Sequence, residues 1–238
     1  MKKGTWYHLF LLAAFLAVWA WAAIEPVYPD DWLLENYLVF IFVPLILLLG
    51  FYFRLSNLSY TLITVFMILH VIGAHYTYSE VPFGYTLQSW FDSQRNMYDR
   101  LVHFSFGLLL AYPIREVFIR ITRVKGFWGY YLPLDVTLAF SAVYELIEWG
   151  AAVVVNPEAG LAFLGTQGDV WDSQKDILIA SIGATIAMLI TFIVNLLFNK
   201  NCMKEIKDSF KIPKGDAPLG EVKLGKMLSE RNAESRKL

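Results

Sequence analysis

Long apolar stretches dominate the chain, and the elements they predict are membrane-spanning helices. Residues 4–24, 36–53, 55–79 and 177–199 contain no Asp, Glu, Lys or Arg. Each stretch reaches the roughly 18 residues that a helix needs to cross the hydrocarbon core of a bilayer. The pattern therefore predicts four clean spans.

Two further stretches are apolar but carry ionisable residues. Residues 101–114 are uncharged, yet 14 residues make only about 21 Å of helix, which is too short for a core of about 30 Å. This span must therefore include Asp99 and Arg100. The other stretch contains Glu145 and Glu148, and Asp135 directly after Pro133 indicates a helix start near 134.

These stretches together predict an all-α polytopic membrane protein. We expect a bundle of six transmembrane helices over residues 1–199, with a polar tail over 200–238. The predicted spans are about 5–24, 34–53, 57–77, 99–119, 134–155 and 174–198. The tail lacks apolar periodicity, so we expect a mobile extension or a short surface helix.

Charge in the connecting segments predicts the orientation. Lys and Arg gather on one side of the predicted spans, and acids gather on the other: Glu25, Asp30, Asp31, Glu35, Glu80, Asp92, Glu158 and Asp169. The positive-inside rule then places both termini in the cytoplasm. Lys2, Lys3 and the segment 20–22 also fit a secretory signal, whose cleavage would leave five spans. The long, bulky apolar run favours a retained helix.

Composition narrows the classes of function. Only 17% of the residues are charged, against roughly 25% in soluble domains. This low charged fraction indicates a protein whose main partner is the lipid bilayer. A net charge of −1 gives no case for nucleic-acid binding. The single cysteine, Cys202, excludes an internal disulfide and a thiolate metal cage. Nothing indicates the oligomeric state.

Three helically spaced polar clusters interrupt the apolar pattern. Each lies on one face of its predicted helix, in the outer half of the predicted bilayer or at its outer edge: Asp99 with His103, Glu145 with Glu148, and Asp169 with Asp172 and Asp176. Ionisable groups in hydrocarbon usually face a partner, a cavity or a substrate path. We therefore expect the clusters to meet in one pocket that opens on the extracytoplasmic side.

Glycines fit a tightly packed site. Gly107, Gly150, Gly168 and Gly183 would allow close helix approach or a sharp turn. We expect residues 165–168 to form a tight turn that delivers Asp169.

Three kinds of occupant could balance the clustered acids. A divalent metal (Mn²⁺, Mg²⁺, Fe²⁺ or Zn²⁺) suits carboxylates with an imidazole and no thiolate. Protons would suit a relay or carrier. In a structural network, Arg100 and Lys175 would pair with the acids while their long stems extend outward to the interface.

The leading hypothesis is a metal-dependent envelope enzyme that acts on a lipid-linked or phosphate-bearing substrate. The metal ligands would be Asp99, His103, Asp172 and Asp176, with Glu145 or Glu148 as general base. Arg95, Arg100, Asp169 and Lys175 would contact an anionic substrate. The secondary candidates are His70, His75 and Tyr144. The alternatives are a proton-coupled or cation transporter that uses the same carboxylates, and a non-catalytic membrane scaffold.

Segments 98–104, 144–149 and 168–176 (YDRLVHF, YELIEW and GDVWDSQKD) resemble the YjdF-like family of uncharacterised bacterial inner-membrane proteins. The resemblance covers roughly residues 5–200 and implies a multi-pass protein of the bacterial inner membrane. It implies no particular activity. The order of these motifs is similar, less closely, to VanZ-like membrane proteins. There an amide is common where Glu148 stands, and an Asn where Asp176 stands.

Overall fold

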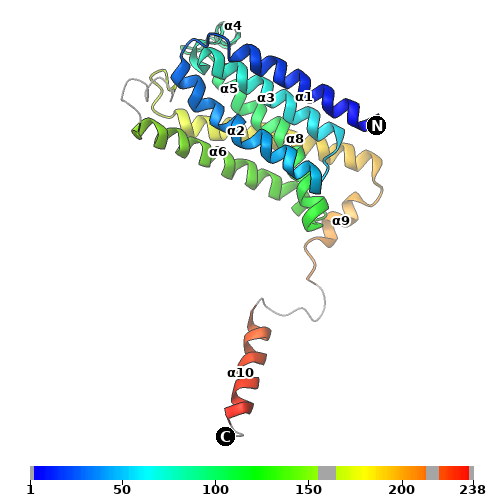
Figure 1. Ribbon diagram of the computed structural model, residues 1–238. Coiled ribbons are helices and arrows are strands. Elements are labelled where there is room, and N and C mark those ends of the chain that lie inside the picture. Colours follow the sequence, from blue (N-terminus) through cyan, green and yellow to red (C-terminus); the bar gives the residue numbers. More distant parts are fainter. Residues whose placement is uncertain (1–2, 155–164, 213–219, 236–238) are drawn as a thin grey trace.

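The computed structural model describes residues 3–154, 165–212 and 220–235, and within these ranges the chain is all-α. The predicted fold class is therefore confirmed. Figure 1 shows long helices packed into one bundle, with the last helix apart from it. The elements are α1 (Lys3–Ala22), α2 (Pro29–Tyr52), α3 (Asn57–Tyr76), η1 (Tyr78–Glu80), α4 (Pro82–Trp90), α5 (Tyr98–Val117), η2 (Phe118–Thr122), α6 (Trp128–Val154), α8 (Asp172–Phe198), α9 (Cys202–Asp208) and α10 (Glu221–Ser235).

Five of these helical stretches are long and apolar enough to cross a membrane: Pro29–Tyr52, Asn57–Tyr76, Tyr98–Thr122, Trp128–Val154 and Asp172–Phe198. The apolar part of α1, Trp6–Ala22, is shorter than this threshold. The sixth span therefore stays a prediction, as does the placement of both termini.

Two helices begin earlier than their apolar patterns predict. α2 begins at Pro29 rather than 34, because a proline fits the first helical position, where no backbone N–H is needed. α6 begins at Trp128 rather than 134, so Pro133 lies inside the helix. A proline there removes one backbone hydrogen bond of a 27-residue helix. The predicted end of this span at 155 lies outside the described residues.

Small residues join α5 to α8 at the centre of the bundle. A β-carbon on Gly107 would overlap the carbonyl oxygen of Ala180, and one on Gly183 would overlap the carbonyl oxygen of Phe104. The predicted close approach is thus confirmed at these two glycines. It is wrong for Gly150, where a β-carbon would meet no atom within 4 Å, because this glycine lies away from the α5–α8 contact.

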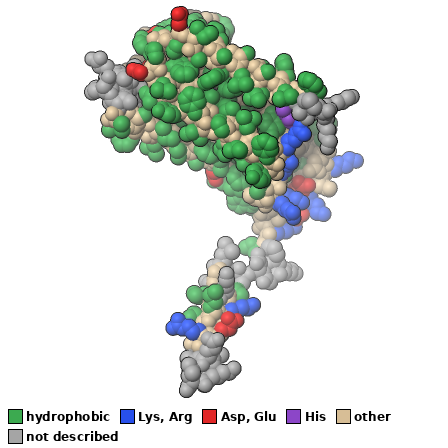
Figure 2. All heavy atoms as spheres, in the orientation of Figure 1, with side chains coloured by type: hydrophobic (Ala, Val, Ile, Leu, Met, Phe, Trp, Pro, Cys, Tyr) green, Lys and Arg blue, Asp and Glu red, His purple; other side chains and the backbone are tan. Residues whose placement is uncertain are grey.

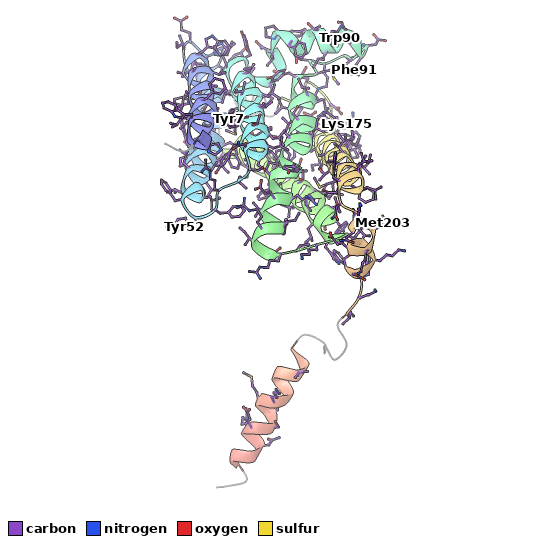
Figure 3. The ribbon with its side chains drawn as sticks, turned by 90° about the vertical axis from the view of Figure 1, so that its right-hand side faces the viewer. Tyr7, Tyr52, Trp90, Phe91, Lys175 and Met203 are labelled. Atoms are coloured by element: carbon purple, nitrogen blue, oxygen red, sulfur yellow. The ribbon has the colours of Figure 1, made fainter. Side chains whose placement is uncertain are left out.

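The two ends of the bundle differ in charge. Lys and Arg side chains gather at the end that carries the N-terminus and α9, away from α4 (Figure 2). Trp90 and Phe91, at the end of α4, lie opposite Met203 of α9 (Figure 3). This is the charge asymmetry on which the predicted orientation rests.

α9 is fastened to the start of α6. The backbone N–H of Phe127 donates to Ser209 Oγ over 3.1 Å, and Trp128 Nε1 donates to the Ser209 carbonyl over 3.0 Å. The rings of Phe127 and Phe210 lie 5.0 Å apart. We call these contacts the α9 clasp. They hold the segment after α8 against the segment before α6.

Candidate functional site

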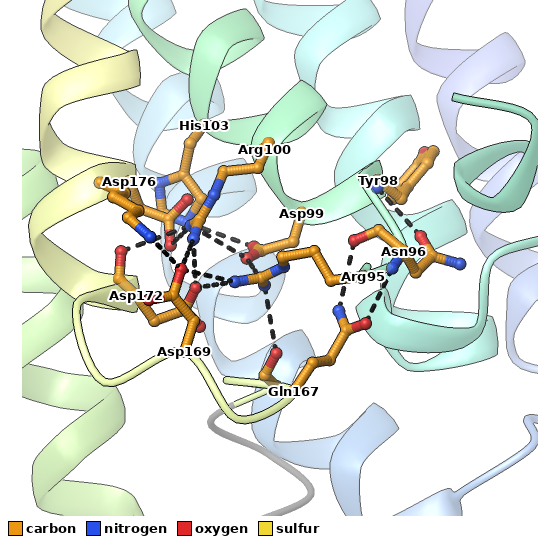
Figure 4. A network of polar contacts seen from close by, with 12 residues as sticks. Arg95, Asn96, Tyr98, Asp99, Arg100, His103, Gln167, Asp169, Asp172 and Asp176 are labelled. Atoms are coloured by element: carbon orange, nitrogen blue, oxygen red, sulfur yellow. Dashed lines mark hydrogen bonds and ion pairs between the residues drawn. The ribbon is translucent and has the colours of Figure 1, made fainter. Parts of the chain in front are cut away.

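Acids and arginines from three segments of the chain meet at the α4 end of the bundle (Figure 4). We call this group the acid–arginine cluster. Its members are Arg95, Asp99, Arg100, His103, Glu145, Asp169, Asp172 and Asp176. The predicted convergence of residues that lie far apart in the sequence is therefore present in the fold.

The turn before α8 brings its aspartates to α5. Gly165 and Gly168 adopt positive φ angles of 57° and 85°, and the N–H of Asp169 donates to the Thr166 carbonyl over 2.9 Å. Gln167 clamps this turn to the segment before α5, since its Oε1 accepts from Asn96 N–H over 2.8 Å. The expected tight turn is confirmed.

Two buried arginines neutralise Asp172. Arg95 Nη1 pairs with Asp172 Oδ1, and Arg100 Nη2 donates to the same oxygen over 2.5 Å. Arg95 Nη2 also donates to Asp99 Oδ2 over 3.1 Å, and Arg100 Nη1 pairs with Asp176 Oδ2. Buried carboxylates need such partners, because an isolated buried charge is strongly unfavourable.

The expectation that Arg100 extends outward is wrong. Its side chain is buried and turned into the cluster, because four aspartates lie within 4 Å of its guanidinium: Asp99, Asp169, Asp172 and Asp176. Lys175 does extend outward, with half of its side chain exposed, and its Nζ lies 2.6 Å from Asp169 Oδ2.

His103 joins the cluster to α6. Its Nε2 lies 3.4 Å from Asp99 Oδ1 and 3.5 Å from Glu145 Oε1. One ligand atom each from Asp99, His103 and Asp176 lie within 4.8 Å of one another. These three could hold a metal ion between α5 and α8, whereas Asp172 is not part of the group and faces the arginines.

Two buried carboxylate oxygens in the cluster have no hydrogen-bond partner within the described part of the chain. They are Glu145 Oε1 and Asp176 Oδ1, on residues that are 7% and 2% exposed. Native proteins pair nearly all buried polar atoms with protein, water or ions. These two atoms therefore point to a cation or another ligand at this position.

Glu35, which sequence reasoning did not select, lies beside the cluster. Its Oε2 accepts from Tyr144 Oη over 2.9 Å, and its carbonyl lies 3.1 Å from His70 Nε2. The available signal was its spacing of four residues from Asp31 at the start of α2. Because Glu35 lies close to Asp30 and Asp31 in the sequence, its charge was assigned to the acidic connecting segment before α2.

The remaining candidates lie around or outside the cluster. His70 Nδ1 lies 2.5 Å from Tyr78 Oη, and His75 Nδ1 lies 3.1 Å from the Ala22 carbonyl, so both imidazoles have partners elsewhere. Tyr144 contacts Glu35, and its ring centroid lies 6.4 Å from that of His103. Glu148 is half-buried on α6, within electrostatic range of Glu145 and Glu35.

Asp169 lies outside the membrane-spanning helices, at the mouth of the cluster. The hydrogen bond from Lys175 and the N–H of Trp171 hold the pKa of the Asp169 carboxyl below its usual value. This carboxylate therefore stays charged at neutral pH and presents its charge next to Arg100.

A cavity of about 540 Å³ continues inward from the cluster, between α2, α3, α5 and α6. Its polar lining consists of His70, His103, Ser141 and Tyr144 at the cluster end, with Tyr60 towards the other end. The rest of its wall is apolar, with no Asp, Glu, Lys or Arg among the lining residues.

Comparisons with known proteins agree with a membrane protein of this kind. Residues 7–196 match the family described as "Predicted membrane protein (DUF2238)". The chain is 44% identical over 154 residues to the "Inner membrane protein YjdF" of Escherichia coli (strain K12), an alignment that covers 64% of this chain and 73% of the relative. No solved structure matches the chain. The similarity to VanZ-like proteins stays a prediction.

Proposed function

From the premise that the chain belongs to the DUF2238 family of predicted membrane proteins, we propose that its acid–arginine cluster is the metal site of an envelope enzyme. The protein is a multi-pass protein of the inner membrane. The proposed substrate is lipid-linked or phosphate-bearing.

The observation that carries this proposal is that Glu145 Oε1 and Asp176 Oδ1 are buried and lack a hydrogen-bond partner among the described residues, although His103 Nε2 lies 3.5 Å from Glu145 Oε1. Beside them, Asp99, His103 and Asp176 offer three ligand atoms close enough for one ion. Two carboxylates with one imidazole suit Mn²⁺, Mg²⁺, Fe²⁺ or Zn²⁺. Arg95, Arg100 and Lys175 face five acids, so an excess of negative charge remains that a divalent cation would offset.

The residues divide into three proposed roles. Asp99, His103 and Asp176 would hold the ion, and Glu145 would accept a proton from a water or substrate hydroxyl beside it. Glu148 stays a second candidate for this base. Asp172 positions Arg95 and Arg100, and those arginines with Asp169 and Lys175 would surround an anionic group that reaches the cluster from outside.

Metal analysis of the protein purified without chelator tests the proposal. We expect about one divalent ion per chain, lost in His103→Ala and kept in His75→Ala, which removes an imidazole at the α1–α3 contact instead. A wild-type protein without stoichiometric metal would refute the proposal, as would a His103→Ala variant that keeps it. Elution as a monodisperse species on size exclusion confirms that each variant is folded.

A proton-coupled or cation transporter has less support than an enzyme. A conduction path needs polar groups that continue inward, whereas the cavity below the cluster is lined mainly by apolar side chains. A non-catalytic scaffold would be indicated if Glu145→Gln lowered heat stability and the wild-type protein held no metal.

We also propose that the cluster faces the extracytoplasmic side, with both termini in the cytoplasm. The support is the gathering of Lys and Arg at the opposite end of the bundle (Figure 2). In a Cys202→Ser background, Asp92→Cys should react with a membrane-impermeant maleimide in spheroplasts, and Lys211→Cys only after lysis. The reverse labelling pattern would show that the protein has the opposite orientation in the membrane.

A further inference from the structure

The cavity between α2, α3, α5 and α6 has the dimensions of a site for a hydrocarbon chain. Along α5 and the first residue of η2 it extends from Val102 to Phe118, which is a rise of 16 residues, or about 24 Å of helix. One leaflet of the hydrocarbon core is about 15 Å deep. The cavity volume of about 540 Å³ is many times the roughly 30 Å³ that one water molecule occupies in the liquid, so the space exceeds that of a small solvent-filled void. A single long chain fits these limits.

The cavity opens to the side, between α2 and α6. Nowhere in the described residues do the backbones of these two helices come within 8 Å of each other. Three large side chains of the cavity wall are substantially exposed to the bilayer: Leu45 and Leu49 of α2 at 46% and 44%, and Phe140 of α6 at 58%. A chain can therefore enter from the lipid phase without crossing a polar surface.

The polar groups of the wall lie mainly where the cavity meets the acid–arginine cluster. Ser141 Oγ is buried and unpartnered there, so it is available to donate to an ester or hydroxyl oxygen of a ligand. At this level the hydrogen bond between Tyr144 and Glu35 bridges the gap between α6 and α2. A chain in the cavity would thus place its polar end beside His103 and Glu145.

We propose that this cavity binds the hydrocarbon chain of a membrane lipid, which enters between α2 and α6 and presents its polar end to the cluster. This inference deepens the proposed function and rests on it only for the role of the cluster. It makes the apolar part of the substrate a long acyl or prenyl chain.

Photo-crosslinking in nanodiscs tests the proposal. The probe is phosphatidylethanolamine with a diazirine near the end of one acyl chain, and mass spectrometry maps the labelled residues. Lipid around the bundle reaches Ile190, which is 54% exposed, but not Leu110, which lines the cavity and is 7% exposed. We expect labelling of Leu110 and of Phe66, a buried residue of α3 in the same cavity wall. Label at Ile190 with none at Leu110 or Phe66 would overturn the proposal.

Matched variants of α6 locate the chain. Val136→Trp fills the cavity and should lower labelling of Leu110 at least fivefold, with Ile190 unchanged. Val143→Trp adds the same bulk on the lipid-facing side, where Val143 is exposed, and should change neither. Undiminished labelling of Leu110 in Val136→Trp would also overturn the proposal. Wild-type labelling decides the question if Val136→Trp fails to fold.

Two further measurements identify the class of lipid that supplies the chain and test whether lipid binding depends on the metal. Competition by polyprenyl phosphate but not by phosphatidylglycerol would identify a prenyl carrier, and the opposite result a phospholipid. Removal of the ion with EDTA should leave the label at Leu110 unchanged. If the wild-type protein purified without chelator holds no metal and still labels Leu110, the proposed enzyme is refuted and the lipid site stands.

Discussion

Arg100 is the residue that joins the acids of α8 to α5. Its guanidinium pairs with Asp172 and Asp176 in a buried setting. Removing one partner of a buried ion pair leaves the other charge uncompensated, which costs about 3–5 kcal/mol. We therefore expect Arg100→Gln to lower the melting temperature in detergent sharply. Asp176→Asn in the same chain should restore part of the loss.

The control for Arg100 is a pair at the surface. Lys211 and Asp208 lie 2.6 Å apart with Lys211 largely exposed, and such pairs contribute about 0–1 kcal/mol. Lys211→Ala should thus leave the melting temperature nearly unchanged. Equal effects of the two substitutions would show that burial of the arginine is unimportant.

Asp169 predicts a specific effect of acid. Its pKa is lowered in the folded protein by the hydrogen bond from Lys175, so it contributes stability above the unfolded pKa of about 3.9 and loses it as the pH falls through the folded value. The difference in melting temperature between wild type and Asp169→Asn should be constant from pH 7 to about pH 5 and shrink below about pH 4. A difference that grows in acid would contradict this interpretation.

The chemistry of single residues was easier to predict than their partners. Spacing placed Asp99 with His103, and Asp172 with Asp176, on shared helix faces, and the fold brings both pairs into one cluster. Spacing could not show that Arg95 and Arg100 would both form ion pairs with Asp172, because this pairing depends on how α5 packs against α8. For the same reason Glu35 was missed.

At the scale of helices, we expect the contact between α5 and α8 to be the one most sensitive to substitution. A methyl group on Gly107 would overlap backbone of α8, and overpacking of this kind costs about 1–3 kcal/mol. Gly107→Ala should lower the melting temperature. Gly150→Ala, the same change at a helix position with open space, should be neutral or raise it. A loss at both positions would contradict this interpretation, because alanine has the higher helix propensity and should not destabilise a helix position with open space.

Helix existence followed from apolar length, while helix starts did not. The apolar run predicts a start of α2 at 34, and Asp135 after Pro133 predicts a start of α6 near 134, but both helices extend back through a polar or aromatic turn. The extension of α2 makes Asp31 a buried helical residue, one turn before the buried Glu35. Capping and packing of the first turn determine where each helix begins, and the hydrophobic pattern of the sequence does not encode them.

At the scale of the whole molecule, the α9 clasp ties the segment after α8 to the start of α6. The boundary at 199 stays a prediction that places α9 in the tail, while Ser209 and Phe210 contact the start of α6. A chain that stops after Ile212 should keep the melting temperature of the full protein, and one that stops after Asn199 should lose several degrees. Identical melting curves would show that the clasp contributes nothing.

The α9 clasp also connects the C-terminal segment mechanically to α6. A pull on α10 would be transmitted to the start of α6 as well as to the end of α8. These two helices carry Glu145 and Asp176, whose carboxylates each have a buried oxygen without a hydrogen bond. Force applied at this end of the bundle would thus reach the two carboxylates through the helices themselves.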